Sequence, residues 1–392
     1  MALDVLVDDF KALIEKDEQA HLLRRLSKSL LPQTEHCILC ANDYLGFSQH
    51  PQVIHAAKQA THEYGAGARA ARTLHGTSHL HLELESAISE WKETEAALLF
   101  PTGYMAAIGL ISTVAQPGDL ILIDRSCHSC LFDGAKLSGA SVRVFGHQSI
   151  NDLQLALEHN EKHHPGRRTF IIVESLYSMD GDFAPLNEIY ECADRYHATL
   201  IVDEAHANGV WGPEGSGCIR ENHLPPNSVF QLGTLGKSLG ASGGFVAGPQ
   251  LLIQYLMQRS RSFLFTTAAP PSVIASALTA LRLCQTDLGK ERRNRLKERV
   301  EHARTKLAPE INVQSQIIPI PVQNEEACQQ MGAQLENEGI FVSVVRSPTV
   351  PLGSARLRLS LHSELELPAF DSALNRMTSL ISDHNDLIES KA

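Results

Sequence analysis

Residues 198–209 read ATLIVDEAHANG, an apolar run that turns polar at its carboxyl end. Other runs end in the same way, with DRSCHS after 120–123, ESLYSMDGD after 170–173 and GTLGKS after 229–232. Such short Val, Ile and Leu runs alternate with helix-like segments, which predicts an α/β fold with a mainly parallel sheet covered by helices on both faces. Ligands bind at the carboxyl edge of such sheets, so the polar ends mark the expected functional site.

The chain on either side of this region has a different pattern. Residues 4–31 repeat apolar positions at helical spacing up to Pro32, and a short strand follows. After Pro270-Pro271 come two helices, the strands IIPIPV, FVSVV and ARLRLSL, and a last helix; the charge run 290–306 is expected to be a solvated helix face. We therefore expect an N-terminal helical arm with the first strand over 1–45, a large domain over 46–275, and a smaller C-terminal α/β domain over 276–392.

Composition limits the classes of function. The 392 residues are 43% apolar, which is typical of a globular protein, and the net charge of −11 would repel nucleic acid and anionic membranes. The N-terminus has acidic residues where a signal peptide needs a basic start, and no apolar run is long enough to span a bilayer. We expect a soluble, cytoplasmic protein with no nucleic-acid or membrane partner.

The eight cysteines include two Cys-x-x-Cys pairs, Cys37 with Cys40 and Cys127 with Cys130. Together they match the ligand set of a four-thiolate zinc site, so a zinc-binding or thiol protein is the alternative outside enzymology. Both pairs lie in apolar or strand-like sequence, where free cysteines are usually small buried hydrophobes. We therefore expect no metal.

The lysine in QLGTLGKSLGASG (231–243), with IVDEAH (201–206) before it, suggests a nucleotide-driven motor. A Walker phosphate loop needs glycine five residues before its Gly-Lys-Ser, and that position is Gln231. The acidic box also precedes Lys237, whereas in such helicases it follows the phosphate loop. The motor interpretation is rejected.

A lysine with no acidic neighbour in sequence can form a Schiff base, which suits Lys237. Asp203, which ends an apolar strand, can hold a pyridinium nitrogen protonated, and pyridoxal phosphate needs such an acid. Gly103 and Tyr104 open a helix whose N-terminus can bind a phosphate, and Thr234 can add a hydroxyl there. Together these residues predict a pyridoxal-phosphate site.

The sequence resembles the α-oxoamine synthase family of pyridoxal-phosphate enzymes over nearly its whole length from about residue 20. These enzymes condense an amino acid with an acyl thioester and release carbon dioxide. The stretches that carry the resemblance are ANDYLG (41–46), FPTGYMAA (100–107), DRSCHS (124–129), ESLYSMDGD (174–182), VDEAHANGVWGPEGSG (202–217), GTLGKSLGASGG (233–244) and SPTVPLGSARLRLS (347–360). The resemblance implies a fold-type I, aspartate aminotransferase-like transferase and a homodimer with shared active sites.

The resemblance also implies roles for individual residues. Lys237 would hold the cofactor covalently and act as base, Asp203 would pair with the pyridine nitrogen, and His128 would stack on the ring. His206 and Ser178 would lie near the phenolic oxygen. The phosphate would be held by Gly103, Tyr104 and Thr234, with Thr266 or Thr267 of a neighbouring subunit, and the amino acid would contact Asn42, His128 and Arg358.

Family members differ in their amino acid and acyl group. SPTVPLGSARLRL resembles members that join L-alanine to a pimeloyl thioester, on coenzyme A or a carrier protein, in biotin synthesis, and it implies that Thr349 and Arg24 lie near the acyl chain. GAGARAARTLHGT (65–77) is closer to members that join glycine to an acetyl group, and Cys127 and Cys130 depart from the usual residues beside the histidine. We prefer alanine and pimeloyl, with the glycine reaction or another acyl group as the alternative.

Overall fold

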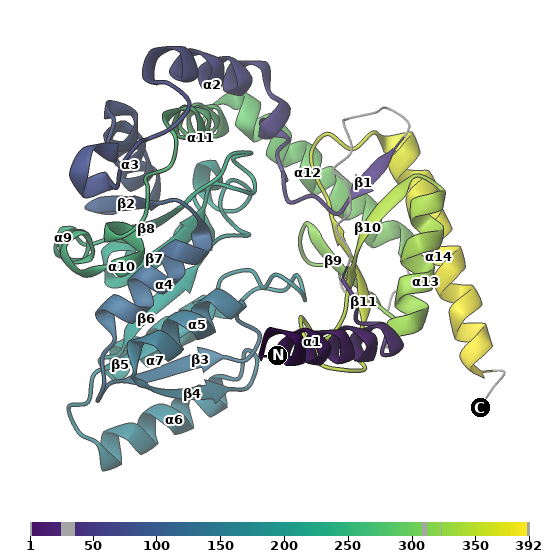
Figure 1. Ribbon diagram of the computed structural model, residues 1–392, viewed down its shortest axis with the longest axis horizontal. Helices are drawn as coiled ribbons and strands as arrows, with labels where there is room; N and C mark the ends of the chain where they lie inside the picture. Colours follow the sequence, from purple (N-terminus) through teal and green to yellow (C-terminus); the bar gives the residue numbers. More distant parts are fainter. Residues whose placement is uncertain (1, 25–35, 308–310, 312, 323, 390–392) are drawn as a thin grey trace. The chain divides into compact units, whose positions relative to one another are not determined.

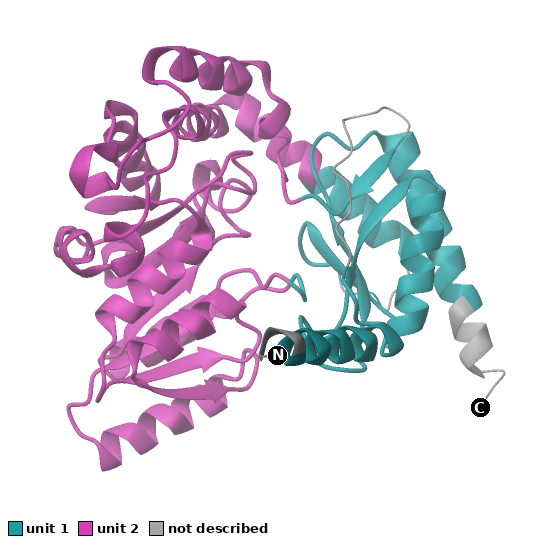
Figure 2. Cartoon of the chain, viewed as in Figure 1, with its two compact units in different colours: residues 1–41, 179–181, 297–392 teal, residues 42–178, 182–296 magenta. Residues whose placement is uncertain are grey.

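The computed structural model describes residues 2–24, 36–307, 311, 313–322 and 324–389 (Figure 1). It divides into two compact units (Figure 2). The larger unit comprises residues 42–178 and 182–296, and the smaller unit comprises residues 1–41, 179–181 and 297–392.

The larger unit is built on a seven-stranded sheet with the order β2-β8-β7-β6-β5-β3-β4. Among these strands β8 is antiparallel to both of its neighbours, and the other pairings are parallel. The sheet confirms the predicted fold class. Its strands are β2 Ala96–Phe100, β3 Leu120–Asp124, β4 Ser141–Phe145, β5 Thr169–Glu174, β6 Thr199–Asp203, β7 Val229–Thr234 and β8 Gly244–Gly248.

Apolar side chains on both faces place the central strands in the core. Residues 171–173 and 200–202 are at most 1% exposed, and burying one such side chain is worth about 1.5–3 kcal/mol. The helices that pack around the sheet are α2 Pro51–Tyr64, α3 His79–Lys92, α4 Gly103–Val114, α5 Ser129–Ser138, α6 Ile150–His163, α7 Leu186–Arg195, α8 Cys218–Glu221, α9 Gln250–Arg259, α10 Arg261–Leu264 and α11 Pro271–Cys284. None of the helices in the described residues has both the length and the apolar character needed to cross a membrane.

The smaller unit is built on a four-stranded sheet with the order β1-β10-β11-β9. The strand β1 Cys37–Leu39 pairs in parallel with β10 Ile340–Val345, and the antiparallel strands β11 Arg356–Ser360 and β9 Ile317–Pro321 complete it. Its helices are α1 Ala2–Gln19, α13 Glu325–Asn337 and α14 Leu367–Glu389, and α12 Asp287–Lys306 continues from the larger unit.

The division between the units differs from the expected boundaries at 45/46 and 275/276. The N-terminal segment belongs to the smaller unit because β1 adds a strand to the C-terminal sheet. The helix α11 belongs to the larger unit because it packs on α2 and α3. Both assignments rest on contacts between distant parts of the chain, which local sequence patterns do not encode.

The N-terminal helix is shorter than its sequence period suggests. It was expected over residues 4–31 but ends at Gln19, and residues 25–31 lie outside the described part. His21 has a φ of 56°, and the amide of Leu22 donates to the Asp17 carbonyl at 2.7 Å. This is a Schellman termination, in which a residue with positive φ closes the last turn.

The charge run on α12 corrects a second expectation, because not all of its arginines lie on a solvated face. Arg292 is 7% exposed, and its guanidinium lies 4.9 Å above the ring of Phe47. Arg299 is 9% exposed, and its Nε donates to the carbonyl of Leu365 at 3.0 Å. Planar guanidinium groups can enter a core in this way because aromatic faces and carbonyls satisfy them.

Candidate active site

The polar strand ends meet at one edge of the larger sheet. The last residue of β5, Glu174, is in register with Asp203, the last residue of β6, and Asp203 is in register with Leu232 of β7. Because these strands are parallel, the segments that follow them leave from the same edge. The sheet therefore places the loops of ESLYSMDGD, DEAHANG and GTLGKS beside one another.

Lys237 contacts a histidine from the neighbouring loop. Its Nζ lies 2.6 Å from Nε2 of His206, and Nδ1 of His206 lies 2.7 Å from the hydroxyl of Tyr44. Lys237 is half-buried, whereas His206 is 6% exposed and Tyr44 is fully buried. The structure therefore brings together the predicted lysine and histidine and adds a tyrosine that the sequence analysis did not select.

A tight turn fixes the lysine. The amide of Gly240 donates to the carbonyl of Lys237 at 2.8 Å, and Gly240 has a φ of 60°. A Cβ at this glycine would lie 2.2 Å from the backbone nitrogen of Ser48. Glycine is required here both by the backbone conformation and by the close approach of a second chain segment.

Asp203 uses one carboxylate oxygen to shape its own loop. Its Oδ1 accepts a hydrogen bond from the amide of Ala205 at 2.8 Å, and the residue is half-buried. This local bond turns the chain from β6 toward His206. The position agrees with the predicted edge, and the pairing of Asp203 with a pyridine nitrogen stays a prediction.

Glu174 is a buried carboxylate that the sequence analysis overlooked. It is 2% exposed; Oε1 accepts from the amide of His128, and Oε2 accepts from the amide of Ser178 at 3.2 Å. Burial and the negative charge of Asp203 raise the pKa of Glu174 to about 8, although Lys237 and the two amide bonds act in the opposite direction. One carboxylate thus ties together two predicted cofactor residues. Its position as the last residue of an apolar strand beside Asp203 was the available signal.

His128 caps the N-terminus of α5. Its Nδ1 accepts a hydrogen bond from the amide of Cys130 at 3.2 Å, and the Cys130 sulfur lies 3.0 Å from the same nitrogen. Burial lowers the pKa of His128, with Asp203 acting in the opposite direction. The ring is therefore best described as neutral, with Nδ1 as acceptor and the proton on Nε2.

Three of the four cysteines in the two Cys-x-x-Cys pairs are buried, and Cys40 is exposed. Burial raises the pKa of Cys37 to about 12 and also raises the pKa values of Cys127 and Cys130. All eight cysteines lie in the described part of the chain, and each is a free thiol.

The start of α4 lies against Thr234. A Cβ at Gly103 would be 3.4 Å from both Cβ and Oγ1 of Thr234, so the hydroxyl sits beside the first turn of the helix. The first amides of a helix have no partner within it, and a phosphate suits them. Tyr104 is 46% exposed and donates its hydroxyl to Oδ2 of Asp133 at 2.7 Å. Its backbone amide, and not its phenol, is therefore the group available at this helix end.

Taken together, these groups fit pyridoxal phosphate. The cofactor needs an amine to form a Schiff base, an acid for the pyridine nitrogen and an anion site for the phosphate. Lys237, Asp203 and the α4 N-terminus with Thr234 supply these groups within the larger unit.

The stretch 65–77, which departed from the expected pattern, has a structural function. Arg72 donates two hydrogen bonds of 2.9 Å to the carboxylate of Glu85 and a third of 2.9 Å to Thr77. Glu85 also accepts from the amide of Leu99 in β2 at 2.9 Å. Arg72 therefore fastens this loop to α3 and β2, and its position does not by itself indicate a substrate.

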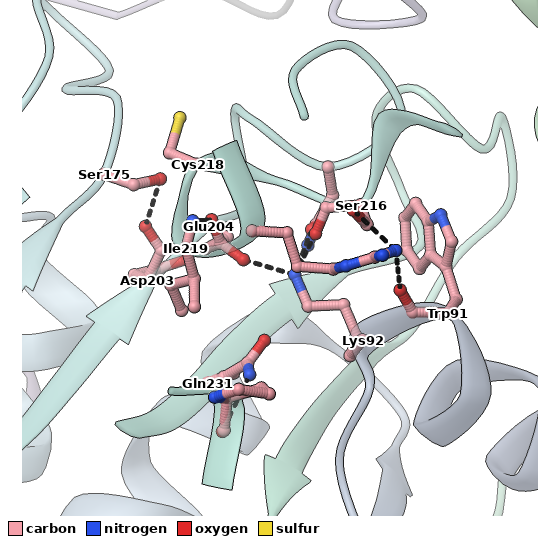
Figure 3. A network of polar contacts seen from close by, with 12 residues as sticks. Trp91, Lys92, Ser175, Asp203, Glu204, Ser216, Cys218, Ile219 and Gln231 are labelled. Carbon is pink, nitrogen blue, oxygen red and sulfur yellow. Dashed lines mark hydrogen bonds and ion pairs between the residues drawn. The ribbon is translucent and has the colours of Figure 1, made fainter. Parts of the chain in front are cut away.

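Glu204, adjacent to Asp203, uses its carboxylate in a buried network of polar contacts (Figure 3). Its Oε2 pairs with the ammonium group of Lys92, and its Oε1 accepts from the amide of Ile219 at 2.9 Å. Lys92 also donates to Oδ1 of Asn208 at 3.0 Å and to the carbonyl of Ser216. Lys92 and Glu204 are fully buried, so this ion pair is structural.

The remaining predicted residues are placed separately. Asn42 precedes Tyr44 in the larger unit and accepts its hydroxyl proton at 3.1 Å. In the smaller unit, Arg358 is 4% exposed and donates to Ser360 at 2.7 Å. Arg24 donates to the hydroxyl of Thr349 at 3.3 Å, so the two residues expected near the acyl chain are in contact. The substrate roles of these residues stay predictions.

Comparison with known proteins identifies relatives over most of the chain. The model of the aminotransferase class I and II family matches residues 34–374. A putative 8-amino-7-oxononanoate synthase of Desulforudis audaxviator is 39% identical over 93% of this chain and 97% of its own length. The 8-amino-7-oxononanoate synthase of Trichlorobacter lovleyi is 36% identical over 87% of this chain and 88% of its own.

Two solved structures extend the comparison to the fold. A serine palmitoyltransferase from S. paucimobilis, with a bound adduct of pyridoxal phosphate and myriocin, has a TM-score of 0.89 and 29% identity over 96% of this chain and 98% of that one. The 8-amino-7-oxononanoate synthase of Francisella tularensis has a TM-score of 0.74 and 26% identity over 90% of this chain and 100% of that one. The likeness thus covers both units of the chain.

Proposed function

We propose that this chain, which belongs to the α-oxoamine synthase family of pyridoxal-phosphate acyltransferases, condenses L-alanine with a pimeloyl thioester. The products are 8-amino-7-oxononanoate, the free thiol and carbon dioxide, in biotin synthesis. The chemistry rests on one observation, the 2.6 Å contact between Lys237 and His206 at the sheet edge that carries Asp203. The choice of substrates is supported by the names of the relatives and by the SPTVPLGSARLRL stretch.

In this proposal pyridoxal phosphate, when bound, accepts the negative charge left on Cα of the amino acid. Lys237 would hold the cofactor covalently, Asp203 would keep its ring nitrogen protonated, and His128 would stack on the ring. Ser178 and His206 would bind near the phenolic oxygen. The phosphate would contact the backbone at Gly103 and Tyr104 and the hydroxyl of Thr234.

Lys237 has a second task, because removal of the Cα proton needs a neutral amine as general base. His206 is close enough to accept a proton from the lysine, since 2.6 Å is within hydrogen-bond reach for proton transfer. Lys237 would hold the cofactor and, when its amine is free, would act as the base. The turn at Gly240 keeps the start of its side chain in place while the amine moves.

The substrate carboxylate needs a donor set of its own. Arg358 is buried and planar, so it suits a two-pronged bond to a carboxylate, and Asn42 can add an amide donor. The protonated Nε2 of His128 is a third donor. We assign the acyl chain to Arg24 and Thr349, whose contact of 3.3 Å supports a shared role.

We also propose a homodimer with shared active sites, in which Thr266 or Thr267 of a second copy completes the phosphate site. Family resemblance is the support for this state. Light scattering of the purified protein tests it, and a monomer that is active at all dilutions would contradict it.

The alternative within the family is the condensation of glycine with an acetyl thioester, as in 2-amino-3-ketobutyrate coenzyme A ligase. Its support was the 65–77 stretch, and the ion pair between Arg72 and Glu85 now gives that stretch a structural explanation. Because the chain also matches the structure of a serine palmitoyltransferase, thioesters with longer acyl groups are included among the substrates to be tested.

A grid of substrates separates these alternatives. Alanine, glycine and serine are each combined with pimeloyl, acetyl, succinyl and palmitoyl thioesters, on coenzyme A and, for pimeloyl, on a carrier protein, and thiol release is followed. We expect the largest kcat/KM for alanine with pimeloyl. A larger value for glycine with acetyl would overturn the substrate assignment, and a colourless protein that binds stoichiometric zinc would overturn the family chemistry.

A further inference from the structure

Tyr44 lies next to the reactive groups without a role in the proposed reaction. It follows Asn42 in the ANDYLG stretch and is fully buried. Its hydroxyl lies 3.1 Å from Oδ1 of Asn42 and 2.7 Å from Nδ1 of His206. These bonds continue to Lys237 through the other nitrogen of the same imidazole.

The direction of these bonds follows from what each atom can donate. An amide oxygen can only accept, so the Tyr44 hydroxyl gives its one proton to Asn42. The phenolic oxygen must then accept from His206, which places the ring proton on Nδ1. The lone pair of Nε2 therefore points at Lys237, whose ammonium can only donate.

We propose that Tyr44 is a positioning residue that holds His206 as a proton acceptor for Lys237; this inference rests on the proposed function of Lys237 as a base. An N–H bond of the lysine ammonium breaks, a bond from that proton to Nε2 of His206 forms, and the lysine becomes a neutral amine. The imidazolium then donates its Nδ1 proton to Tyr44 in a charge-assisted bond, which stabilises the charged ring.

Other charged groups surround this chain of bonds. Glu174 and Asp203 at the ends of β5 and β6 interact with each other, and Lys237 acts electrostatically on Glu174. His128, before α5, is influenced by both Asp203 and Lys237. These groups determine the electrostatic potential around Lys237, whereas Tyr44 determines which nitrogen of His206 carries the proton.

The test is the exchange of the alanine α-proton with solvent deuterium, followed by proton NMR on the cofactor-loaded enzyme without acyl thioester. Tyr44→Phe removes the hydroxyl alone. We expect exchange to slow about 10–100-fold, as when a partner that orients a histidine is lost. The binding of pyridoxal phosphate, measured by absorbance, should change little. We also expect the pH profile of exchange to shift, because His206 loses its stabilising acceptor.

Tyr177→Phe is the matched control. Tyr177 is equally buried in the same unit, but its ring lies edge-on to His147, with 4.4 Å between centroids. Exchange should stay at the wild-type rate in this variant. Equal rates for the two variants would overturn the positioning role, whereas a wild-type enzyme that binds no cofactor and exchanges no proton would overturn the proposed function instead.

If Tyr44→Phe does not fold, the wild-type enzyme still provides a test. Histidines labelled with ¹⁵N report which ring nitrogen is protonated, and His206→Asn assigns the signal. A protonated Nδ1 supports the inference, and a protonated Nε2 overturns it.

Discussion

Two lysines of the larger unit reach the loop that follows β6, and they differ in what they meet there. Lys92 is fully buried and forms an ion pair with Glu204 (Figure 3). Lys237 is half-buried and contacts the imidazole of His206. A lysine held by a carboxylate stays charged, whereas a lysine beside an imidazole can pass on its proton. The four residues 203–206 therefore include one side chain that stabilises the fold, Glu204, and one that belongs to the proposed chemistry, His206.

Lys237→Ala gives the largest expected effect on the chemical side of this comparison. It removes both the point of cofactor attachment and the base, and the base alone is typically worth about 10²–10⁴-fold in rate. We expect thiol release to fall by at least this factor and the absorbance of covalently held cofactor to disappear. The melting temperature of the protein without cofactor should change little. Retained activity would remove Lys237 from the mechanism.

Lys92→Met should lower the stability of the fold and leave the absorbance of covalently held cofactor in place. Removal of one partner leaves the Glu204 carboxylate buried without compensation, which costs about 3–5 kcal/mol of unfolding free energy. Denaturant titration measures this loss. The double variant with Glu204→Gln should recover part of it, because it removes the uncompensated charge. Lost cofactor absorbance with unchanged stability would show that the two lysine sites are not separate.

Glu174→Gln tests whether a third buried carboxylate belongs to the chemical region. Above about pH 8 the Glu174 carboxylate is charged. An amide in its place then weakens the bonds to the amides of His128 and Ser178, and a hydrogen bond to a charged group is worth about 1.5–3 kcal/mol. We expect the dissociation constant of pyridoxal phosphate to rise about tenfold. Asp124→Asn is the matched control, because Asp124 is also buried at a strand end and accepts from Ser126 at 2.8 Å. An equal rise in both variants would argue against a specific role for Glu174.

The smallest expected effect concerns His147, whose ion pairs contribute to stability and not to the proposed chemistry. Burial lowers its pKa, but hydrogen bonds of 3.0 Å to each of Asp124 and Asp182 outweigh this and raise the pKa to about 10. Because the folded pKa lies above the unfolded value, the stabilisation is complete below about pH 6.5 and is lost as the pH rises through about 10. His147→Gln should therefore flatten the fall in stability between these pH values, as measured by denaturant titration. An unchanged slope would contradict the charged histidine.

The local sequence predicted the strands of the larger sheet and selected Lys237 as the candidate reactive lysine. The apolar runs of β3, β5, β6 and β7 each end in polar residues, and this pattern predicted the sheet edge and the joint location of Asp203, His206 and Lys237. Tyr44 and Glu174 were missed because their importance comes from contacts across 162 and 46 residues of the chain. The division into units was missed for the same reason, since β1 pairs with a strand some 300 residues away.

The sequence by itself determined the fold class and the cofactor and predicted the role of Lys237, because strand periodicity and the order of short motifs are local properties. It selected Asp203 as the acid for the cofactor but assigned no role to Glu204, the neighbouring acid after the same strand. Only the tertiary structure decided that Glu204 pairs with Lys92 in the core while Asp203 stays at the edge. Successive side chains leave a strand end in different directions, and what each one meets depends on segments from elsewhere in the chain.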